Sequence, residues 1–255
     1  MNKIKIITTL LLFILSFNVF AQMTENVVDE QGKRQGVWKS YTPEGKLKFT
    51  GQFKDDQPYG TFTYYYPTGE KKAVTSFEEK GMANTQVFHK NGQLMAKGAY
   101  KNKKRDGKWL FYSDYDGKLV SEENYSNGIR NGNMINYFPE SGKIAEQVNF
   151  KNDWEDGPYK QFYENGNLQV KGTYKQGKLV GEVFYYFSSG NTKVKGQYKN
   201  GVKEGYWSFY NEKGVLTKNE KYKNGKIVDT KEFIKTEPEE IKPLKINDED
   251  LKKMN

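Results

Sequence analysis

The stretch that decides the fold reads Gly205-Tyr-Trp-Ser-Phe-Tyr-Asn-Glu-Lys-Gly214-Val-Leu-Thr-Lys-Asn-Glu-Lys-Tyr222-Lys-Asn-Gly225. An aromatic-rich run meets a turn that ends in glycine, and a second run then leads to an Asn-Gly turn. Aromatic residues favour pleated, half-buried surfaces. Two such runs joined by a glycine-containing loop predict a β-hairpin.

This template recurs along the chain with a step of 23 to 25 residues. One landmark is the aromatic residue near the end of the second run: Phe53, Phe77, Tyr100, Tyr125, Phe150, Tyr174, Tyr198 and Tyr222. Another is the glycine that opens a copy, with Asn84 in the one copy that lacks it: Gly36, Gly60, Gly107, Gly132, Gly157, Gly181 and Gly205. A fixed period in this range indicates a repeat array, in which one unit cannot bury its apolar face alone.

The second run of each copy alternates apolar or small residues with polar ones, as in residues 168–174 and 94–100. A period of two with one polar face predicts an antiparallel sheet. One inward position is often glycine, and a strand glycine marks a close approach of another group. We expect an aromatic ring from a neighbouring strand at this position, in the copies with Gly51, Gly98, Gly172 and Gly196.

The first run of each copy carries aromatic residues at its third and sixth positions, such as Trp38 and Tyr41. These positions have opposite parity in a regular strand. Either a bulge redirects the later residue or aromatic side chains cover both faces of the sheet. In the third copy the same numbering places Gln86 third and His89 sixth.

Both kinds of connection are tight turns, so consecutive strands are expected to be neighbours. We predict an all-β fold, an elongated single meandering antiparallel sheet or solenoid of about eight β-hairpin repeats, which must twist along its length. The array is predicted at residues 36–229, after a half-repeat that caps its N-terminal edge at residues 22–35. Residues 230–255 lose the period and are expected to be a flexible charged tail.

Residues 1–21 have the pattern of a Sec signal peptide: a short basic start, an apolar run from Ile6 to Phe20, and Ala21 at the junction. The alternative is an uncleaved membrane anchor, which needs about 20 apolar residues, whereas this run is interrupted by polar side chains. We expect cleavage after Ala21 and a periplasmic or secreted product that does not span a membrane.

The residue types in the chain limit which catalytic and metal-binding sites it can form. The chain has no cysteine and one histidine, which excludes thiol nucleophiles, all-thiolate zinc sites and histidine clusters. His89 stands where other copies have Tyr or Phe, so it is interpreted as a substituted aromatic. Paired carboxylates such as Glu155-Asp156 fall near turns, where acidic residues are ordinary surface. We expect no catalytic residue, no metal and no cofactor.

The net charge is +9, and lysines recur at two outward positions of the repeat. Lysines of the second strands are Lys48, Lys97, Lys171, Lys193 and Lys195, and lysines after the landmark aromatic are Lys101, Lys151, Lys175, Lys199 and Lys223. The simpler interpretation is a solvated face that also prevents edge aggregation. The alternative is a surface that binds a polyanion, such as an acidic glycan, lipopolysaccharide or a membrane.

The stretch Tyr198-Lys-Asn-Gly201-Val-Lys-Glu-Gly205-Tyr-Trp207 resembles the MORN repeat, and the turn Glu44-Gly45-Lys46-Leu47 resembles its bacterial variant. The resemblance covers residues 28–229. Proteins of this kind are commonly grouped as the YwqK-type family, named as antitoxin components of toxin–antitoxin systems. The resemblance implies a scaffold for proteins or a contact with membrane lipid. A protein that neutralises a cytoplasmic toxin is not expected to carry an export signal, so the predicted signal peptide of this chain does not fit that role.

We therefore predict an exported, non-enzymatic scaffold that most simply binds an unknown protein partner. The alternatives are an antitoxin or immunity-type partner of a toxin and a binder of an acidic envelope polymer. Nucleic acid is not expected as a partner of an exported chain. The candidate surface residues are Trp38, Trp109, Tyr159, Trp207, Lys97, Lys171 and Lys195, with packing in the core as the default role of the aromatic ones.

Overall fold

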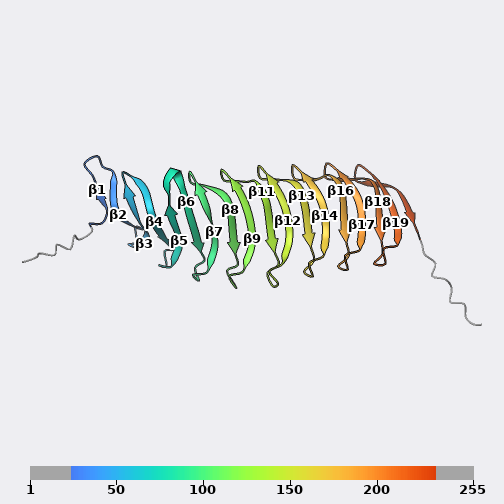
Figure 1. Cartoon of the computed structure of the whole chain (residues 1–255), viewed down its shortest axis with the longest axis horizontal. Helices are drawn as coiled ribbons and strands as arrows, with labels where there is room; N and C mark the ends of the chain where they lie inside the picture. The colour runs from blue at the N-terminus through green and yellow to red at the C-terminus, as the bar shows by residue number, and fades with distance from the viewer. Residues whose placement is uncertain (1–23, 234–255) are drawn as a thin grey trace, which may run out of the picture.

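The structure is a computed structural model, and it describes residues 24–233. The predicted signal peptide with its cleavage point after Ala21 lies outside the described residues, as does most of the predicted tail. Within residues 24–233 the chain forms one antiparallel sheet of 20 strands. Figure 1 shows the strands side by side along the long axis of the molecule. The predicted all-β meander of hairpin repeats is confirmed.

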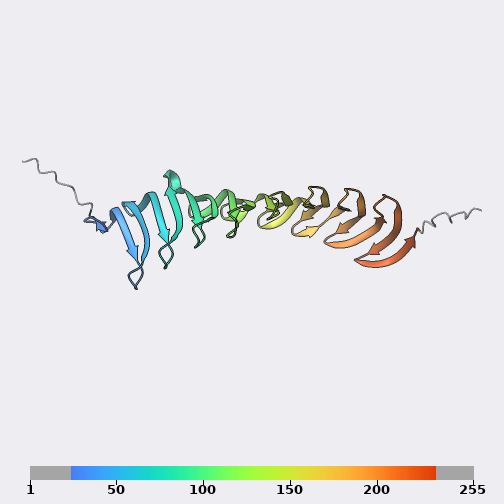
Figure 2. The same ribbon diagram turned by 90° about the horizontal axis from the view of Figure 1, so that it is seen from below.

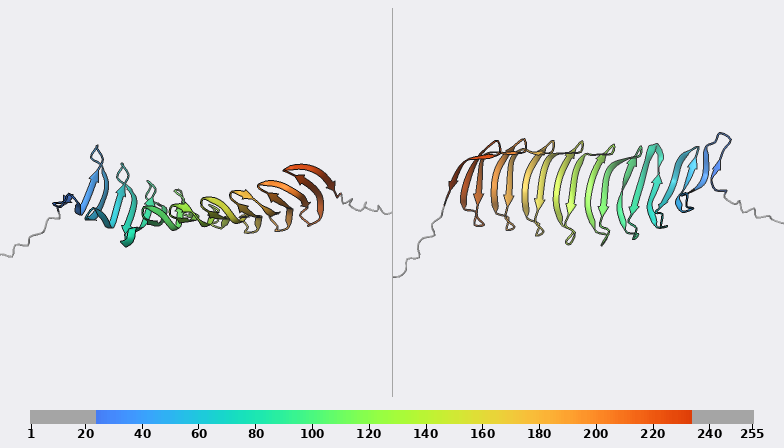
Figure 3. Two further views of the ribbon diagram at one scale, coloured as in Figure 1. Left: turned by 90° about the horizontal axis from the view of Figure 1, so that it is seen from above. Right: turned by 180° about the vertical axis from the view of Figure 1, so that it is seen from behind.

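The strands and the single 3-10 turn follow one another as β1 (Val27–Val28), β2 (Arg34–Tyr41), β3 (Leu47–Lys54), β4 (Gln57–Tyr65), β5 (Lys71–Phe77), η1 (Glu79–Gly81), β6 (Met82–Phe88), β7 (Leu94–Lys101), β8 (Lys104–Tyr112), β9 (Leu119–Ser126), β10 (Ile129–Arg130), β11 (Gly132–Tyr137), β12 (Ile144–Lys151), β13 (Trp154–Phe162), β14 (Leu168–Lys175), β15 (Lys178–Leu179), β16 (Gly181–Tyr186), β17 (Thr192–Lys199), β18 (Val202–Tyr210), β19 (Leu216–Lys223) and β20 (Lys226–Glu232). The short strands β10 and β15 continue directly into β11 and β16 of the same repeats. Figures 2 and 3 show that the sheet twists along its length and that its strands bend into arcs, as expected for a sheet of this extent.

Except between β5 and β6, where η1 lies, the connections between repeats are two-residue turns with left-handed backbone. Asn200 and Gly201 have φ of 52° and 82°, and Asn152 and Asp153 have 52° and 65°. Positive φ at both central residues matches the twist of a hairpin. The N–H of Gly201 donates to the carbonyl of Leu179 in the preceding repeat at 2.9 Å. Such bonds stack the turns into one continuous side of the array, the turn edge, at residues 54–57, 101–104, 126–129, 151–154, 175–178, 199–202 and 223–226.

One face of the sheet, the inner face, holds the buried side chains. Trp109, Trp207 and Val183 are each 1% exposed, and Phe62 is 2% exposed. The landmark aromatics lie on this face beside them, with the ring of Tyr198 5.2 Å from the ring of Trp207 in an edge-on arrangement. The core is therefore a layer of rings on one side of a single sheet. The opposite side is called the outer face.

The strand glycines of the inner face admit an aromatic ring in three of the four predicted copies. A Cβ atom on Gly98 would lie 2.5 Å from the ring of Trp109, and one on Gly51 or Gly196 would overlap with Phe62 or Trp207. The prediction is wrong for Gly172. The facing residue there is Val183, and an added Cβ would lie at an ordinary 3.4 Å from Leu179 and 3.5 Å from Val183.

Of the two alternatives for the first strand, the second is confirmed: aromatic side chains cover both faces, and the bulge that is present does not redirect the sixth residue. The register shifts between the fifth and sixth positions of most copies, for example between Tyr185 and Tyr186. The sixth residue nevertheless lies on the outer face, because the ring of Tyr186 stacks on that of Phe184 at 6.4 Å between centroids, and Phe184 is adjacent to the inward Val183. The repeat thus has a bulge and also has aromatic side chains on both faces.

The third copy begins at Ala83, one residue earlier than the sequence predicts. Ala83 pairs with Tyr100 and Thr85 with Gly98, which are the register positions of the opening glycine and of the third residue. Asn84 therefore does not replace the glycine, and the sixth position is Phe88 instead of His89. The reason is that β5 and β6 pair without a register shift, whereas the corresponding pairs β3 with β4, β7 with β8, β12 with β13 and β17 with β18 shift beside the opening glycine.

The array ends at strand β1 on the N-terminal side and at strand β20 on the C-terminal side, and β20 extends beyond the predicted end at residue 229. Strand β1 pairs with β2, at the edge where a half-repeat was predicted. At the other end β20 continues to Glu232 and pairs with β19 along its length. The tail predicted to start at residue 230 therefore begins inside a strand. Its first residues add to the sheet because they find free backbone groups on β19.

Candidate interaction surface

The predicted aromatic candidates lie in or near the core. Trp109 and Trp207 are 1% exposed, so neither is available to a partner. Trp38 is half-buried and donates its indole N–H to the carbonyl of Gln35 at 3.1 Å. Tyr159 is half-buried against Tyr174, with ring centroids 5.1 Å apart. The aromatic stripe is corrected to a structural role, because all four residues project from the inner face.

The inner face has an electrostatic character of its own. Burial, with a smaller effect of the Glu146 carboxylate, raises the pKa of Tyr159 to about 12. Basic groups cover several landmark rings: the guanidinium carbon of Arg130 lies 4.2 Å from the centre of Phe150, and Lys203 Nζ lies 4.7 Å from that of Tyr222. Such cation–π contacts stabilise a layer that no second sheet covers.

The three predicted lysines lie together on the outer face. Lys97, Lys171 and Lys195 are exposed, and they occupy the same row of facing residues across the sheet. This outer-face row is continuous in register from β2 to β20: Lys39, Thr50, Thr63, Val74, Gln86, Lys97, Leu110, Glu122, Ile135, Gln147, Lys160, Lys171, Phe184, Lys195, Ser208, Asn219 and Lys231. The repeat thus places its lysines in a line.

The outer-face row is strongly unbalanced in charge, since it holds six lysines and one carboxylate, Glu122. Glu122 is already paired with Lys108, and this contact lowers the pKa of the Glu122 carboxyl. Within residues 24–233, Lys160, Lys171 and Lys195 take part in no ion pair. The row from β13 to β20 therefore offers free positive charge without a neighbouring carboxylate in line.

Aromatic side chains flank the row on the same face. Lys195 Nζ lies 6.0 Å from the ring centre of Tyr210, and Lys97 Nζ lies 5.8 Å from that of Tyr112. Phe184 stands in the row itself, between Lys171 and Lys195. The surface combines ammonium groups with half-buried rings, a composition suited to binding an acidic macromolecule that also offers apolar contacts.

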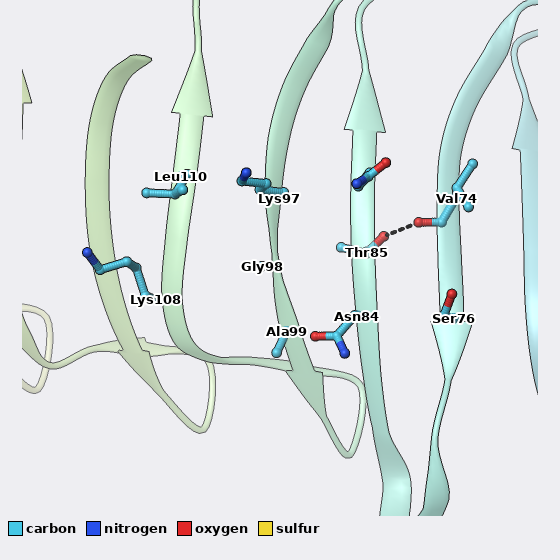
Figure 4. A pocket seen from close by; sticks show the side chains of 10 residues that line it. Val74, Ser76, Asn84, Thr85, Lys97, Gly98, Ala99, Lys108 and Leu110 are labelled. Carbon is cyan, nitrogen blue, oxygen red and sulfur yellow. Dashed lines mark hydrogen bonds between the residues drawn. The ribbon is translucent and has the colours of Figure 1, made fainter.

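The outer face is hollowed where the third copy departs from the template. A depression of about 450 Å³ lies over β5 to β8, because Ser76, Ala99 and Asn84 are short there. Figure 4 shows its labelled lining, with Lys97 and Lys108 among the longer side chains and the Thr85 hydroxyl bonded to the Val74 carbonyl. Lys108 is neutralised by Glu122, so the depression adds space to the face and little charge.

One exposed aromatic residue was missed at the level of sequence. Trp154 is 61% exposed and is the first residue of β13, on the turn edge. A signal was present: the other copies carry Gln57, Lys104, Ile129, Lys178, Val202 and Lys226 directly after the turn. A tryptophan at a polar or aliphatic turn position breaks the pattern and marks a difference between copies.

His89 and the acidic residues form no centre of the kind that holds a metal. In the part of the chain that the structure describes, no three His, Asp or Glu side chains gather as metal ligands. His89 follows β6, where its ring nitrogen lies 3.3 Å from the carbonyl of Tyr112 in the next repeat. Two tyrosines that follow the first strand of their own repeats make an equivalent contact with the next repeat. The hydroxyl of Tyr66 donates to the carbonyl of Phe88, and that of Tyr163 donates to the carbonyl of Tyr186.

A membrane-spanning helix is not found in residues 24–233. Comparison with protein families identifies four segments as MORN repeat variants: residues 34–55, 84–102, 155–176 and 179–200. The chain therefore carries MORN-variant repeats, in agreement with the resemblance of its motifs. The strands that lie between these segments, β4 with β5 and β8 to β12, form hairpins of the same kind, so the same fold continues between them.

A search of the curated proteins found no match. Among solved structures, the chain is similar to one titled Crystal Structure of TcdB2-TccC3-Cdc42, with 14% identity over 76% of this chain and 12% of that chain and a TM-score of 0.20. A second, Crystal Structure of TcdB2-TccC3, has 11% identity over 76% and 13% of the two chains and the same TM-score. The chain spans only a small part of those proteins, and similarity at this level supports no conclusion on function.

Proposed function

We propose that this chain is an exported, non-enzymatic scaffold that binds an acidic surface of a partner protein through the outer face. Repeats of this kind generally serve interactions with proteins or membranes. The observation that carries the proposal is the outer-face row, with six lysines against one paired carboxylate. The partner is expected to place carboxylates along the row and apolar groups against Phe184 and Tyr210.

Physical reasons favour this face over the other. The large rings of the inner face are buried, so exposing them to a partner would cost packing energy. On the outer face, free ammonium groups raise the association rate with an acidic surface, and half-buried rings add apolar contact. An antitoxin or immunity partner of an exported toxin falls within this proposal, because neutralisation by binding needs a surface and no catalysis.

Reversing three charges of the row tests the proposal. A pull-down from the envelope fraction with the chain from residue 22 onward supplies the partner, and the triple variant K160E/K171E/K195E is then titrated against it. We expect the affinity to fall about 10- to 100-fold, since each exposed charge pair contributes about 0.2–1 kcal/mol and reversal adds repulsion. Calorimetry or interferometry measures the dissociation constant.

The control variant is K46E/K90E/K213E, which makes the same change in net charge at exposed lysines of the hairpin loops. Its affinity for the partner is expected to stay within about twofold of that of the native chain when both are measured at 0.15 M salt, because salt at this concentration screens charges that do not contact the partner. An equal loss in both triple variants, or none in the first, contradicts a role for the outer-face row. Circular dichroism confirms that both variants are folded.

A second candidate function is a binder of an acidic envelope polymer, favoured by the continuity of the row across the sheet. The salt dependence of the affinity distinguishes polymer binding from protein binding. Binding held only by ammonium groups weakens steeply between 0.05 and about 0.5 M salt, whereas a protein that also packs on Phe184 and Tyr210 retains much of its affinity. Loss of binding after protease treatment of the partner fraction further indicates a protein.

A further inference from the structure

The turn edge holds a second surface that shares no residue with the outer-face row. Trp154 begins β13, and its ring lies against the backbone of Gly177 in the next turn. A Cβ atom at Gly177 would be 3.0 Å from the ring atom Cε3. This glycine therefore seats the ring, while 61% of the residue remains exposed. Because Trp154 is the only tryptophan so exposed among residues 24–233, packing does not explain it.

A hollow of about 510 Å³ opens beside this ring. Its lining consists of Trp154, Lys175, Gln176, Lys178, Val180 and Asn200. These residues come from three successive repeats: the start of β13, the turn at residues 175–178 and the turn at residues 199–202. The stacking of turns brings them together, since Gly177 N–H donates to the carbonyl of Glu155 and Gly201 N–H to that of Leu179.

The polar groups of the hollow are of two kinds, amides and ammonium groups. No hydrogen bond of the Gln176 or Asn200 amide group is found among the described residues, so each has donors and an acceptor free. Lys175 Nζ lies 3.5 Å from Asp156 Oδ2, and Lys178 has no ion pair within residues 24–233. No carboxylate lines the hollow. Lys178 is therefore a lining ammonium group without an ion pair among these residues, and Glu155, whose Oε2 would lie 3.5 Å from a Cβ atom at Gly177, stands beside the ring of Trp154.

We propose that this hollow binds a sugar residue that bears a carboxylate. The ring of the sugar would lie on Trp154, its hydroxyls would meet the amides of Gln176 and Asn200, and its carboxylate would face Lys178. A few convergent polar groups around an aromatic platform are the usual composition of a small-ligand site. The site goes beyond the scaffold function and does not depend on it.

An acidic peptide is the competing occupant, and the backbone disfavours it. Extended peptides bind sheets largely by main-chain hydrogen bonds to an unpaired strand edge. Here the turn N–H groups already donate to the preceding repeat, so no main-chain ladder is open beside Trp154. Recognition must then come from the ring face and the side-chain amides, which suits a ring with hydroxyl groups.

The test uses trigalacturonate and its methyl ester, which has the same rings without charge, in calorimetry with the chain from residue 22 onward. We expect trigalacturonate to bind more tightly than the ester. Trp154→Ala is expected to weaken both at least tenfold. Lys178→Gln is expected to remove the preference for the acid while the ester still binds, which separates the ring contact from the charge contact.

Two controls make the result specific. Val202→Ala changes the residue at the same position of a later repeat, which is 44% exposed and outside the hollow, and is expected to leave binding unchanged. K160E/K171E/K195E is expected to retain the trisaccharide, so failure here and failure of the proposed function are distinguishable. Tighter binding of a triglutamate peptide, or no binding of either sugar, overturns the proposal.

Discussion

At the scale of the residue, the strand glycines of the inner face show how one missing Cβ atom makes room for a ring. Gly196 and Gly172 stand at the same position of their repeats, yet only Gly196 faces a tryptophan. The sequence identified the shared position from alternation alone. Alternation did not show what fills the space beside each glycine. The residue at the facing position varies between repeats, with Trp207 beside Gly196 and Val183 beside Gly172.

These two glycines give a matched prediction. Gly196→Ala is expected to lower the free energy of unfolding by about 3 kcal/mol, because the added methyl group overlaps with a ring that is 1% exposed. Gly172→Ala is expected to change it by less than about 0.5 kcal/mol, since the added atom meets Val183 at van der Waals distance. Urea titration followed by circular dichroism measures both. Equal effects would contradict the packing assigned to Trp207.

At the scale of the element, a repeat is a hairpin whose first strand begins with a glycine of positive φ. The seven opening glycines all have φ between 65° and 120°, which explains why the sequence keeps glycine there. The third copy has no glycine there because β6 pairs with β5 without the register shift that lies beside the opening glycine of other repeats. Sequence spacing alone could not locate this difference, since a missing bulge shortens the step by only one residue.

Gly181 tests the backbone requirement without a steric complication. Its φ is +68°, and an added Cβ would meet nothing within 4 Å. Gly181→Ala is expected to cost about 1–2 kcal/mol, and Gly181→Asn less, because asparagine adopts this conformation more readily. Thermal or urea unfolding ranks the three proteins. If alanine is no worse than asparagine, positive φ is not what selects the glycine.

At the scale of the whole molecule, the sheet is a chain of local contacts, because each strand pairs with the next and the core is one layer of rings. Trp207 packs with Val170, Val183 and Tyr222 in one cluster near the C-terminal end. In arrays of this kind stability is a sum of repeat terms and nearest-neighbour interfaces. A defect is therefore expected to stay local.

Trp207→Ala tests this locality. We expect a loss of about 3–5 kcal/mol, seen in hydrogen exchange as faster exchange of amides in β16 to β19. Amides of β3 to β5 are expected to keep their native protection, since no buried contact connects them to the cluster. Phe184→Ala, on the outer face of the same region, serves as the milder control. A uniform loss of protection along the sheet would indicate global cooperativity.

The sequence by itself determined the repeat, the hairpin, the single antiparallel sheet and the outward lysines, because period and alternation are local properties of the chain. Only the tertiary structure decided that Trp109 and Trp207 are buried while Trp154 is not, since exposure depends on which repeat packs over which. It also decided that Lys160, Lys171 and Lys195 stand in one row. Register joins residues from different repeats, and bulges shift that register by single residues that a period cannot reveal.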